Sequence, residues 1–327
     1  MKNIVDKLIP ASRFGSAMAA IVAVAGLTVA GECLSASFLL LYGWGLFVGM
    51  PFFLGMVAVL VYGYRLPRKY TESMKVCLYA VLLAGATLLG VAIEGLGCLI
   101  MAAPIALALA LLGGTVAHAL LRIAWWKHDP DKLLCAAVLA IPAFIGIDDA
   151  TVGPAPLLCA QSTVDIRAAP QTVWRHVVTF NELPAERDWI FHTGVAYPIR
   201  AEIQGRGVGA VRKCVFSTGP FIEPIEVWDE PRLLKFSVIR NPEPMQEWSP
   251  YGSIQPPHLV GYMVSEAGQF LLTRNPDGST HLEGTTWYRH HLYPAGYWQV
   301  WSDFIIHRIH MRVLNHVKRL AEKDSRQ

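Results

Sequence analysis

Charged side chains are scarce in this sequence. Asp, Glu, Lys and Arg make up 16% of the 327 residues, whereas apolar residues make up 53%. Soluble domains average about 25% charged residues, and the mean hydropathy of +0.36 excludes disordered and collagen-like chains. The six cysteines form no CxxC pair and no Cys/His set at metal-ligand spacing. We therefore expect no disulfide scaffold, no metal and no cofactor.

The scarcity of charge is confined to one half of the chain. Residues 1–160 hold 10 Lys/Arg and 8 Asp/Glu, against 18 and 17 in residues 161–327. The net charge of +3 and the absence of a long basic run give no indication of a nucleic-acid partner. The sequence predicts a multi-pass membrane domain over 1–155 and a globular domain over 161–323.

The first half contains five apolar stretches, and a membrane-spanning helix needs about 20 such residues. The fifth stretch is short and contains Pro142, and Pro51 in the overlong second indicates a kink or, alternatively, a re-entrant hairpin. The expected spans cover 14–31, 36–64, 76–93, 98–121 and 133–150.

Loop charges give an independent indication of topology. Basic residues precede the first stretch and follow the second and fourth, at Lys2, Lys7, Arg13, Arg65, Arg68, Lys69, Lys75, Arg122, Lys127 and Lys132. The remaining junctions carry acids, at Glu32, Glu94, Asp148 and Asp149. Under the positive-inside rule, this alternation predicts a cell-membrane protein with a cytoplasmic N-terminus and an extracytoplasmic C-terminal domain, provided that the fifth stretch crosses.

Two ionisable residues near the spans have a functional and a structural interpretation. Glu94 and His118 could mark a transport pathway. A solvated turn acid and an interfacial histidine explain them more simply, so we expect the helices to form an anchor or a small bundle. The bilayer is the expected partner; protein partners cannot be predicted.

From residue 162 the sequence alternates apolar and polar residues, as strands do. We expect a strand at 162–167, helical pieces at 170–180 and 183–191, six further strands, and an amphipathic helix at 295–322. The six strands are expected at 197–204, 210–217, 221–229, 232–240, 267–274 and 280–290. Between the first two, the GxGxG pattern of 205–209 is flanked by strands and predicts a hairpin rather than a phosphate loop. The order predicts an α+β layer, an antiparallel sheet curved around one long helix.

The opening Val164-Asp-Ile-Arg-Ala-Ala-Pro170 with Val173-Trp174, and the closing helix Tyr297-Trp298 through Leu320-Ala-Glu322, resemble the START-like helix-grip superfamily. This superfamily is also described as SRPBCC, or as polyketide cyclase/dehydrase and lipid-transport proteins. The resemblance covers about 162–322 and implies an apolar cavity for a lipid, polyketide-like or aromatic ligand. The preceding membrane region and the insertion at 241–265 depart from the minimal domain. The insertion has five prolines among Met245, Trp248 and Tyr251, which suits either a lid over the cavity or packing along the sheet edge.

Candidate binding residues follow from strand alternation and from the insertion. Arg212 and Phe216 share one strand face, and on the last strand Glu283, Trp287 and Arg289 share another, a mixed set that suits a cavity wall or, alternatively, a solvated outer face. The expected ligand-binding residues are Arg212, Phe216, Phe236, Trp248, Glu283, Trp287 and Arg289.

Other chemistry is less well supported by the sequence. Asp303, His307 and His310 could share a metal, but an i, i+4 pairing of Asp303 with His307 is the simpler interpretation. No Ser-His-Asp pattern is visible, so catalytic residues cannot be named.

Three hypotheses for function remain open at this point. The preferred one is a non-catalytic, membrane-anchored protein that binds, transports or senses a lipid or polyketide-like ligand. The alternative is a cyclase or dehydratase with acid–base residues in the helix-grip cavity. In a third, the helix-grip domain regulates the membrane bundle. Paired ionisable groups open to the cavity would favour the enzyme, an apolar cavity with one polar anchor would favour the carrier, and an interior filled by side chains would favour the regulator.

Overall fold

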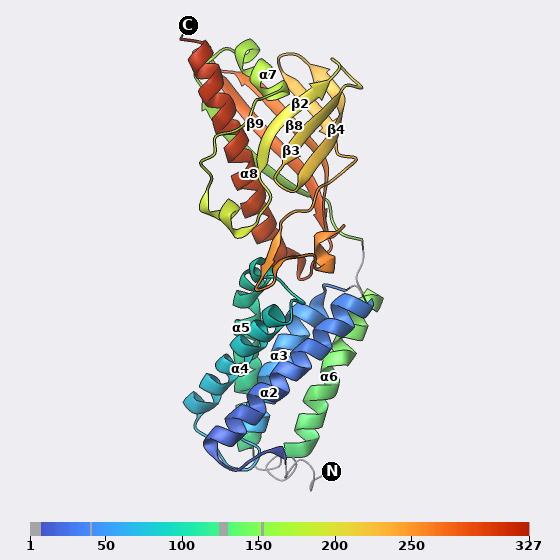
Figure 1. Ribbon diagram of the computed structural model, residues 1–327, viewed down its shortest axis with the longest axis vertical. Coiled ribbons are helices and arrows are strands. Elements are labelled where there is room, and N and C mark those ends of the chain that lie inside the picture. The colour runs from blue at the N-terminus through green and yellow to red at the C-terminus, as the bar shows by residue number, and fades with distance from the viewer. Residues whose placement is uncertain (1–7, 40, 124–129, 152–153, 327) are drawn as a thin grey trace. The chain divides into compact units, whose positions relative to one another are not determined.

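The computed structural model describes residues 8–39, 41–123, 130–151 and 154–326. The chain forms two compact units (Figure 1). The helical unit contains residues 1–153 together with 247–258 and 292–294, and the remainder forms the sheet unit. Lys2, Lys7 and Lys127, used above in the topology prediction, lie outside the described residues, as do the side chains of Asp148 and Asp149.

Five helices of the helical unit are long and apolar enough to cross a membrane. These candidate spans are Arg13–Ala36, Gly45–Tyr62, Tyr70–Gly90, Leu96–Arg122 and Pro130–Ile147. The α-helices within them are α2 (Arg13–Glu32), α3 (Met50–Tyr62), α4 (Tyr70–Gly90), α5 (Leu96–Arg122) and α6 (Pro130–Thr151). The number of spans expected from the sequence is confirmed by these helices, and α6 reaches 22 residues despite Pro142.

The second expected span, 36–64, is divided in the structure. Its first residues continue α2 as the π-helix η1 (Cys33–Leu39), and the second crossing begins at the π-helix η2 (Gly45–Gly49). Pro51 lies in the first turn of α3, directly after η2. A wide π turn tolerates the missing N–H and the bulk of the proline ring. The chain therefore runs on past Pro51 as a helix, and the re-entrant alternative is wrong.

The centre of the helical unit is α3, which is buried along almost its whole length. It crosses α5 at very short range, because a Cβ atom built on Gly55 would lie 1.9 Å from the carbonyl oxygen of Ala110, and one built on Gly113 would lie 1.9 Å from that of Phe52. Small residues permit this kind of backbone approach between membrane helices.

The sheet unit is an antiparallel sheet curled around the C-terminal helix, which confirms the expected fold class (Figure 1). Its seven strands are ordered β1-β9-β8-β5-β4-β3-β2. Their bounds are β1 (Leu158–Ile166), β2 (Pro198–Gln204), β3 (Val211–Phe216), β4 (Gly219–Asp229), β5 (Leu233–Ser237), β8 (Met263–Arg274) and β9 (Thr280–His290), with the helices α7 (Pro170–Val178) and α8 (Ala295–Asp324). The expected helix at 183–191 is replaced by the 3-10 turn η3 (Trp189–Thr193).

Turn residues account for two of the hairpin connections in the sheet. Gly205, Gly207 and Gly209 all adopt positive φ in the β2–β3 connection, a conformation that glycine reaches without steric cost, so the hairpin interpretation of GxGxG is confirmed. Asn275 and Gly278 close the β8–β9 hairpin by a backbone hydrogen bond of 3.0 Å.

The core of the sheet unit lies between α7, α8 and the concave face of the sheet. Trp174 of α7 and Leu314 of α8 are buried against strand residues such as Leu234 and Leu282. Burial of such side chains contributes about 1.5–3 kcal/mol each.

The tip of the 241–265 insertion packs in the helical unit. It forms the small hairpin β6 (Glu247–Ser249) and β7 (Gly252–Ile254), followed by the turn η4 (Pro257–Leu259). The Tyr251 hydroxyl donates to the carbonyl of Gly90 at the end of α4 (2.9 Å). Residues 247–258 therefore contact the ends of apolar helices, which neither sequence interpretation expected, and a lid role for the insertion stays a prediction.

Candidate functional site: an apolar pocket with an acidic end

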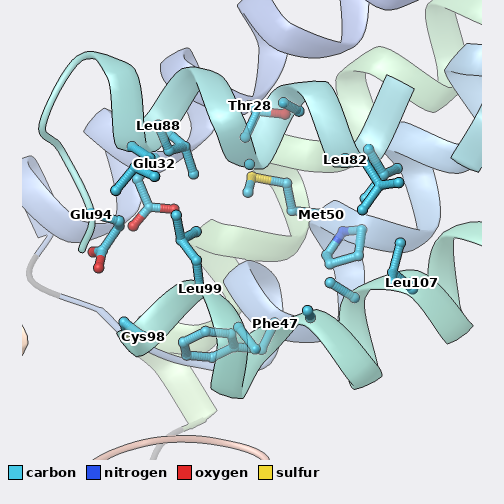
Figure 2. Close-up of a pocket in the computed structure, with 18 of the residues that line it drawn as sticks. Thr28, Glu32, Phe47, Met50, Leu82, Leu88, Glu94, Cys98, Leu99 and Leu107 are labelled. Carbon is cyan, nitrogen blue, oxygen red and sulfur yellow. The ribbon is translucent and has the colours of Figure 1, made fainter. Parts of the chain in front are cut away.

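The helical unit contains a pocket with a volume of about 390 Å³ (Figure 2). Helices α2, α3, α4 and α5 and the π-helix η2 contribute its walls, and most of the lining side chains are aliphatic. Examples are Leu46, Met50, Leu54, Leu82, Leu88, Leu99 and Leu107. Ligand pockets in proteins commonly occupy about 300–1,000 Å³ and are mainly apolar with a few polar groups, so this pocket suits a small apolar ligand.

Polar groups gather at one end of the pocket. In Figure 2, Glu32, Glu94 and Cys98 lie near one another, and Leu82 and Leu107 lie at the other end. Glu32 is the last residue of α2, Glu94 lies in the short α4–α5 connection, and Cys98 is in the first turn of α5. Antiparallel helices bring these ends together, so acids that close separate apolar runs become neighbours.

Tyr42 fixes the orientation of the Glu94 carboxylate. Its hydroxyl donates to Oε1 of Glu94 (3.1 Å), and the tyrosine is 2% exposed. Burial raises the pKa of Tyr42, and the nearby charges of Glu94 and Glu32 raise it further. Tyr42 therefore stays a hydrogen-bond donor, and Oε2 of Glu94 is left for another partner.

Glu247 caps the N-terminus of α5. Its Oε2 accepts from the Gly97 N–H (3.0 Å) and its Oε1 from the Cys98 N–H (2.9 Å), two of the donors that a helix cannot satisfy internally. A Cβ atom on Gly95 would lie 2.1 Å from Oε2 of Glu247, so glycine is required for this approach. The cap anchors β6 to α5 and fixes the backbone of Cys98.

His258 completes the cluster. Its Nδ1 lies 3.5 Å from Oε2 of Glu94, and its Nε2 lies 3.9 Å from Oε1 of Glu247. The imidazole also meets the Tyr42 ring edge-on, with the centroids 5.2 Å apart. Burial alone would lower the pKa of His258, but Cys98, Glu247 and Glu94 outweigh it and raise the pKa. Carboxylate, thiol and imidazole together offer donors for a metal ion or for a polar ligand group.

Sequence reasoning missed this cluster. Glu94 was expected to be a solvated turn acid, but it is 5% exposed. Cys98 was not singled out, because it has no CxxC partner, and His258 was part of the insertion. The signal that could have found the site is the recurrence of acids, Glu32 and Glu94, at the same end of separate apolar spans.

Three of the residues expected to bind a ligand lie in the sheet core. Arg212 is 2% exposed and forms an ion pair with the buried Glu223. The rings of Phe180, Phe236 and Phe270 lie 5.5–5.7 Å from its guanidinium carbon. Phe216 is also buried and meets Phe221 edge-on. The structure thus brings Arg212 and Phe236 together and encloses the charge.

Buried ionisable groups around Arg212 keep their protons more firmly than they do in water. Burial raises the pKa of Glu223, against the opposing effect of Arg212. Burial also raises the pKa of Cys214 to about 12, so this cysteine is a neutral thiol rather than a nucleophile.

The other four expected residues lie elsewhere. Glu283, Trp287 and Arg289 occupy the β9 face opposite to the one that carries Leu282 and Tyr288 into the core. Arg289 pairs with Glu266 (2.6 Å), Glu283 accepts from Thr285 (3.0 Å), and Lys235 lies over the Trp287 ring (5.9 Å). Trp248 belongs to the helical unit and is 54% exposed. A ligand role for these residues stays a prediction.

The expected pairing of Asp303 with His307 is replaced by bonds from α8 to the sheet. Asp303 accepts from the Tyr288 hydroxyl (2.6 Å), and the Nδ1 atoms of His307 and His310 both lie within hydrogen-bond distance of Ser162 Oγ (2.8 and 3.1 Å). Burial, together with the nearby charge of His307, lowers the pKa of His310 to about 4. These histidines attach α8 to β1 and β9.

Comparisons with known proteins concern the sheet unit. No family model and no curated protein matches the chain. Among solved structures, a norcoclaurine synthase point mutant from Thalictrum flavum is 12% identical and covers 53% of this chain and 99% of its own, with a TM-score of 0.35. The ZhuI aromatase/cyclase from a Streptomyces species is 14% identical and covers 52% and 96%, with a TM-score of 0.34. XoxI from Bacillus cereus is 15% identical and covers 52% and 98%, also at 0.34.

Proposed function

We propose that this protein is a membrane-anchored binder of a small apolar or amphiphilic ligand of the lipid or polyketide-like class. The proposal rests on one observation, the 390 Å³ pocket with aliphatic walls and carboxylates at one end. The sequence analysis expected the ligand site in the helix-grip domain, whereas this proposal assigns it to the helical unit. Binding leaves the ligand chemically unchanged in this proposal.

The two parts of the pocket have different roles. Lipid tails are as apolar as leucine, so aliphatic walls give a ligand taken from a bilayer little net gain. Selectivity has to come from the polar end, where Glu32, Tyr42 and Glu94 are buried. A buried polar group that lacks a partner costs about 1–3 kcal/mol. A ligand that supplies that partner is therefore favoured over an ordinary acyl chain.

Binding is also favoured over catalysis by the groups inside the sheet unit. A cyclase or dehydratase needs ionisable groups that reach a ligand. Arg212 and Glu223 are bonded to each other, and phenyl rings surround the guanidinium. This arrangement supports a structural role for the pair rather than an acid–base role in a cyclase.

The test is retention of the ligand by the full chain. Protein purified in a mild detergent would be analysed by native mass spectrometry and by extraction of bound small molecules. The pocket-filling variant is Gly85→Leu, since Gly85 lines the pocket and a Cβ there meets nothing within 4 Å. The matched control is Gly26→Leu on α2, equally open but outside the lining.

We expect wild type and Gly26→Leu to retain one molecular species that Gly85→Leu loses. Wild-type protein that is folded but retains nothing beyond detergent would overturn the proposal, and so would equal retention by both variants.

We further propose that the N-terminus is cytoplasmic and the helix-grip domain extracytoplasmic. The support is the odd number of candidate spans together with the basic residues near 65–69. Alkaline phosphatase fused to the C-terminus should be active, whereas the same enzyme fused after residue 69 should be inactive. The reverse pattern would refute this orientation.

A further inference from the structure

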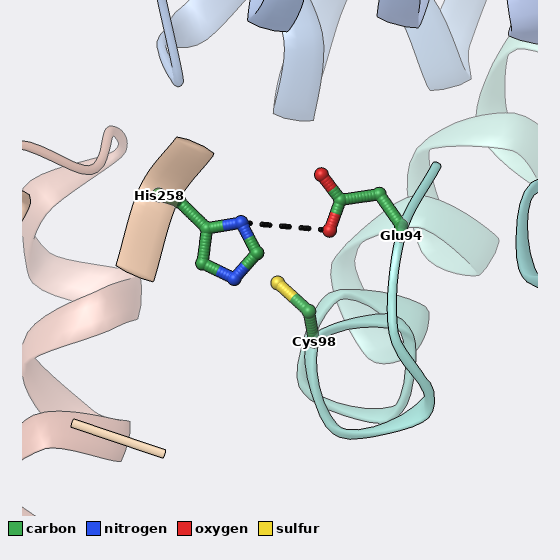
Figure 3. Close-up of side chains that lie close together, drawn as sticks. All are labelled: Glu94, Cys98 and His258. Carbon is green, nitrogen blue, oxygen red and sulfur yellow. Dashed lines mark ion pairs between the residues drawn. The ribbon is translucent and has the colours of Figure 1, made fainter. Parts of the chain in front are cut away.

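Three chemically different donors converge at the acidic end of the pocket (Figure 3). One atom each of Glu94, Cys98 and His258 lies within 4.8 Å of the other two. The ligand atoms of a tetrahedral zinc ion lie about 3.4 Å apart, given metal–ligand distances of 2.0–2.3 Å. Small side-chain movements would therefore close the three donors around one ion.

We propose that Glu94, Cys98 and His258 bind a transition-metal ion of the zinc class. Thiolate and imidazole ligands select such ions over Mg²⁺ and Ca²⁺, which prefer oxygen alone. Three protein ligands leave one position of a tetrahedral ion vacant, as in zinc sites that bind an exchangeable molecule. Glu94 and Cys98 both line the pocket, so that position is available on the pocket side. The metal site does not depend on the ligand binding proposed above.

Unsatisfied atoms are the first independent support. Oε2 of Glu94 and both ring nitrogens of His258 are buried and have no hydrogen-bond partner among the described residues. The two residues are 5% and 7% exposed. The contact of 3.5 Å between Nδ1 and Oε2 is too long for a hydrogen bond. Atoms left in this state are costly, and a bound cation would complete the valence of Oε2 and of one ring nitrogen at once.

The surrounding residues hold the ligands in position. The Tyr42 hydroxyl donates a hydrogen bond to Oε1 of Glu94, which leaves Oε2 on the side of His258. The two carboxylate oxygens of Glu247 accept hydrogen bonds from the backbone N–H groups of Gly97 and Cys98, so both oxygens already have a partner. These are the outer contacts that orient ligands in metal sites. Glu247 is accordingly a positioning residue here and not a ligand.

The charge of the cluster is the second independent support. Glu32 lies beside Glu94, and Glu247 approaches His258 from the other side. The buried carboxylates of Glu94 and Glu247 thus share the positive charge of a single imidazole, that of His258. Buried charge is tolerated when it is paired or when it coordinates a metal. A divalent cation would neutralise the excess that one imidazolium leaves.

The experiment measures metal in the full chain, purified in detergent without chelator, incubated with zinc and desalted. Zinc would be determined by inductively coupled plasma mass spectrometry in wild type, Cys98→Ser and His258→Gln. Matched controls are Cys77→Ser and His118→Gln, which alter a buried cysteine and a buried histidine of the same unit outside the cluster. Size-exclusion elution identifies variants that fail to fold.

We expect about one zinc per chain in wild type and in both controls, and less than about a tenth of that in the two ligand variants. Folded wild type that retains no zinc would overturn the proposal, as would ligand variants that retain as much as wild type.

A second measurement applies if the ligand variants do not fold. Cobalt-loaded wild type should show a thiolate-to-cobalt charge-transfer band that Cys77→Ser keeps, and absence of that band would also overturn the proposal. Ligand retention without zinc would leave the proposed function standing and refute only the metal site.

Discussion

The buried ion pair of the sheet unit gives the sharpest energetic prediction. Glu223→Leu would leave the Arg212 guanidinium buried at 2% exposure without its carboxylate. Breaking a buried pair in this way costs about 3–5 kcal/mol. Arg212 would keep a bond to the Val178 carbonyl (3.3 Å) and three phenyl faces, which offset part of the loss. We therefore expect a value near the lower limit, about 3 kcal/mol.

The assay is hydrogen exchange of β3 and β4 in the full detergent-solubilised chain, read by mass spectrometry. A loss of about 3 kcal/mol corresponds to opening about 150 times more often. Glu226→Leu is the matched control, because Glu226 lies on the same strand but is exposed, and its contact with Lys235 spans 3.7 Å. Such a surface pair contributes at most about 1 kcal/mol.

The double variant Arg212→Leu/Glu223→Leu separates lost packing from stranded charge. Replacing both partners by apolar side chains is often neutral or stabilising, so most of the loss should be recovered. A cost of less than about 1 kcal/mol for Glu223→Leu would refute this reasoning. Arg212 would then be in contact with water, and the interior of the sheet unit would be open to a ligand after all.

Three further predictions concern other parts of the chain. Because the pKa of His310 is about 4 in the folded chain and about 6.5 when unfolded, the folded state binds fewer protons between these values. Stability of the sheet unit should therefore fall by up to about 3 kcal/mol as the pH drops from 6.5 to 4, and His310→Gln, with His307 retained beside it, should flatten this part of a series of urea midpoints. Gly113→Leu should lower the melting temperature and yield of the full chain, because its Cβ meets a carbonyl oxygen at 1.9 Å, whereas Gly146→Leu on α6, with nothing within 4 Å, should not. Glu247→Ala should weaken zinc binding by about 10–100-fold in a chelator competition and lower the melting temperature, and unchanged values for both would show that the cap is dispensable.

The elements of the sheet unit could be read from the sequence because the causes are local. Strand alternation and turn residues predict a strand at 280–290, and β9 has these bounds in the structure. The predicted bounds of the second span, 36–64, were wrong because hydropathy alone does not locate helix ends. Hydropathy averages over a window, and the chain leaves its first helix and begins the next one within a continuous apolar run. Only the number of spans could be predicted there.

The pocket and its acidic end could not be predicted, because the residues that form it are distant in the chain. Glu94 and Cys98 are four residues apart, but His258 comes only after strands β1 to β7 in the chain. Sequence motifs for metal sites detect only ligands that lie a few residues apart in the chain. The expectation that no metal binds therefore followed from spacing alone. Packing of 247–258 within the helical unit is a tertiary event that neither periodicity nor composition encodes.

Two buried ionic clusters among the described residues differ in a way that suggests where binding takes place. Arg212 and Glu223 complete each other, so the sheet unit gains little from a further charged partner. Glu94 and His258 stand at ion-pair distance and still have unfilled valence beside a pocket. A fold bears such a cost, about 1–3 kcal/mol for each atom, most readily where another molecule or ion removes it. On this reasoning we propose that the helical unit, which its composition presents as an anchor, is the part of the chain that binds a ligand.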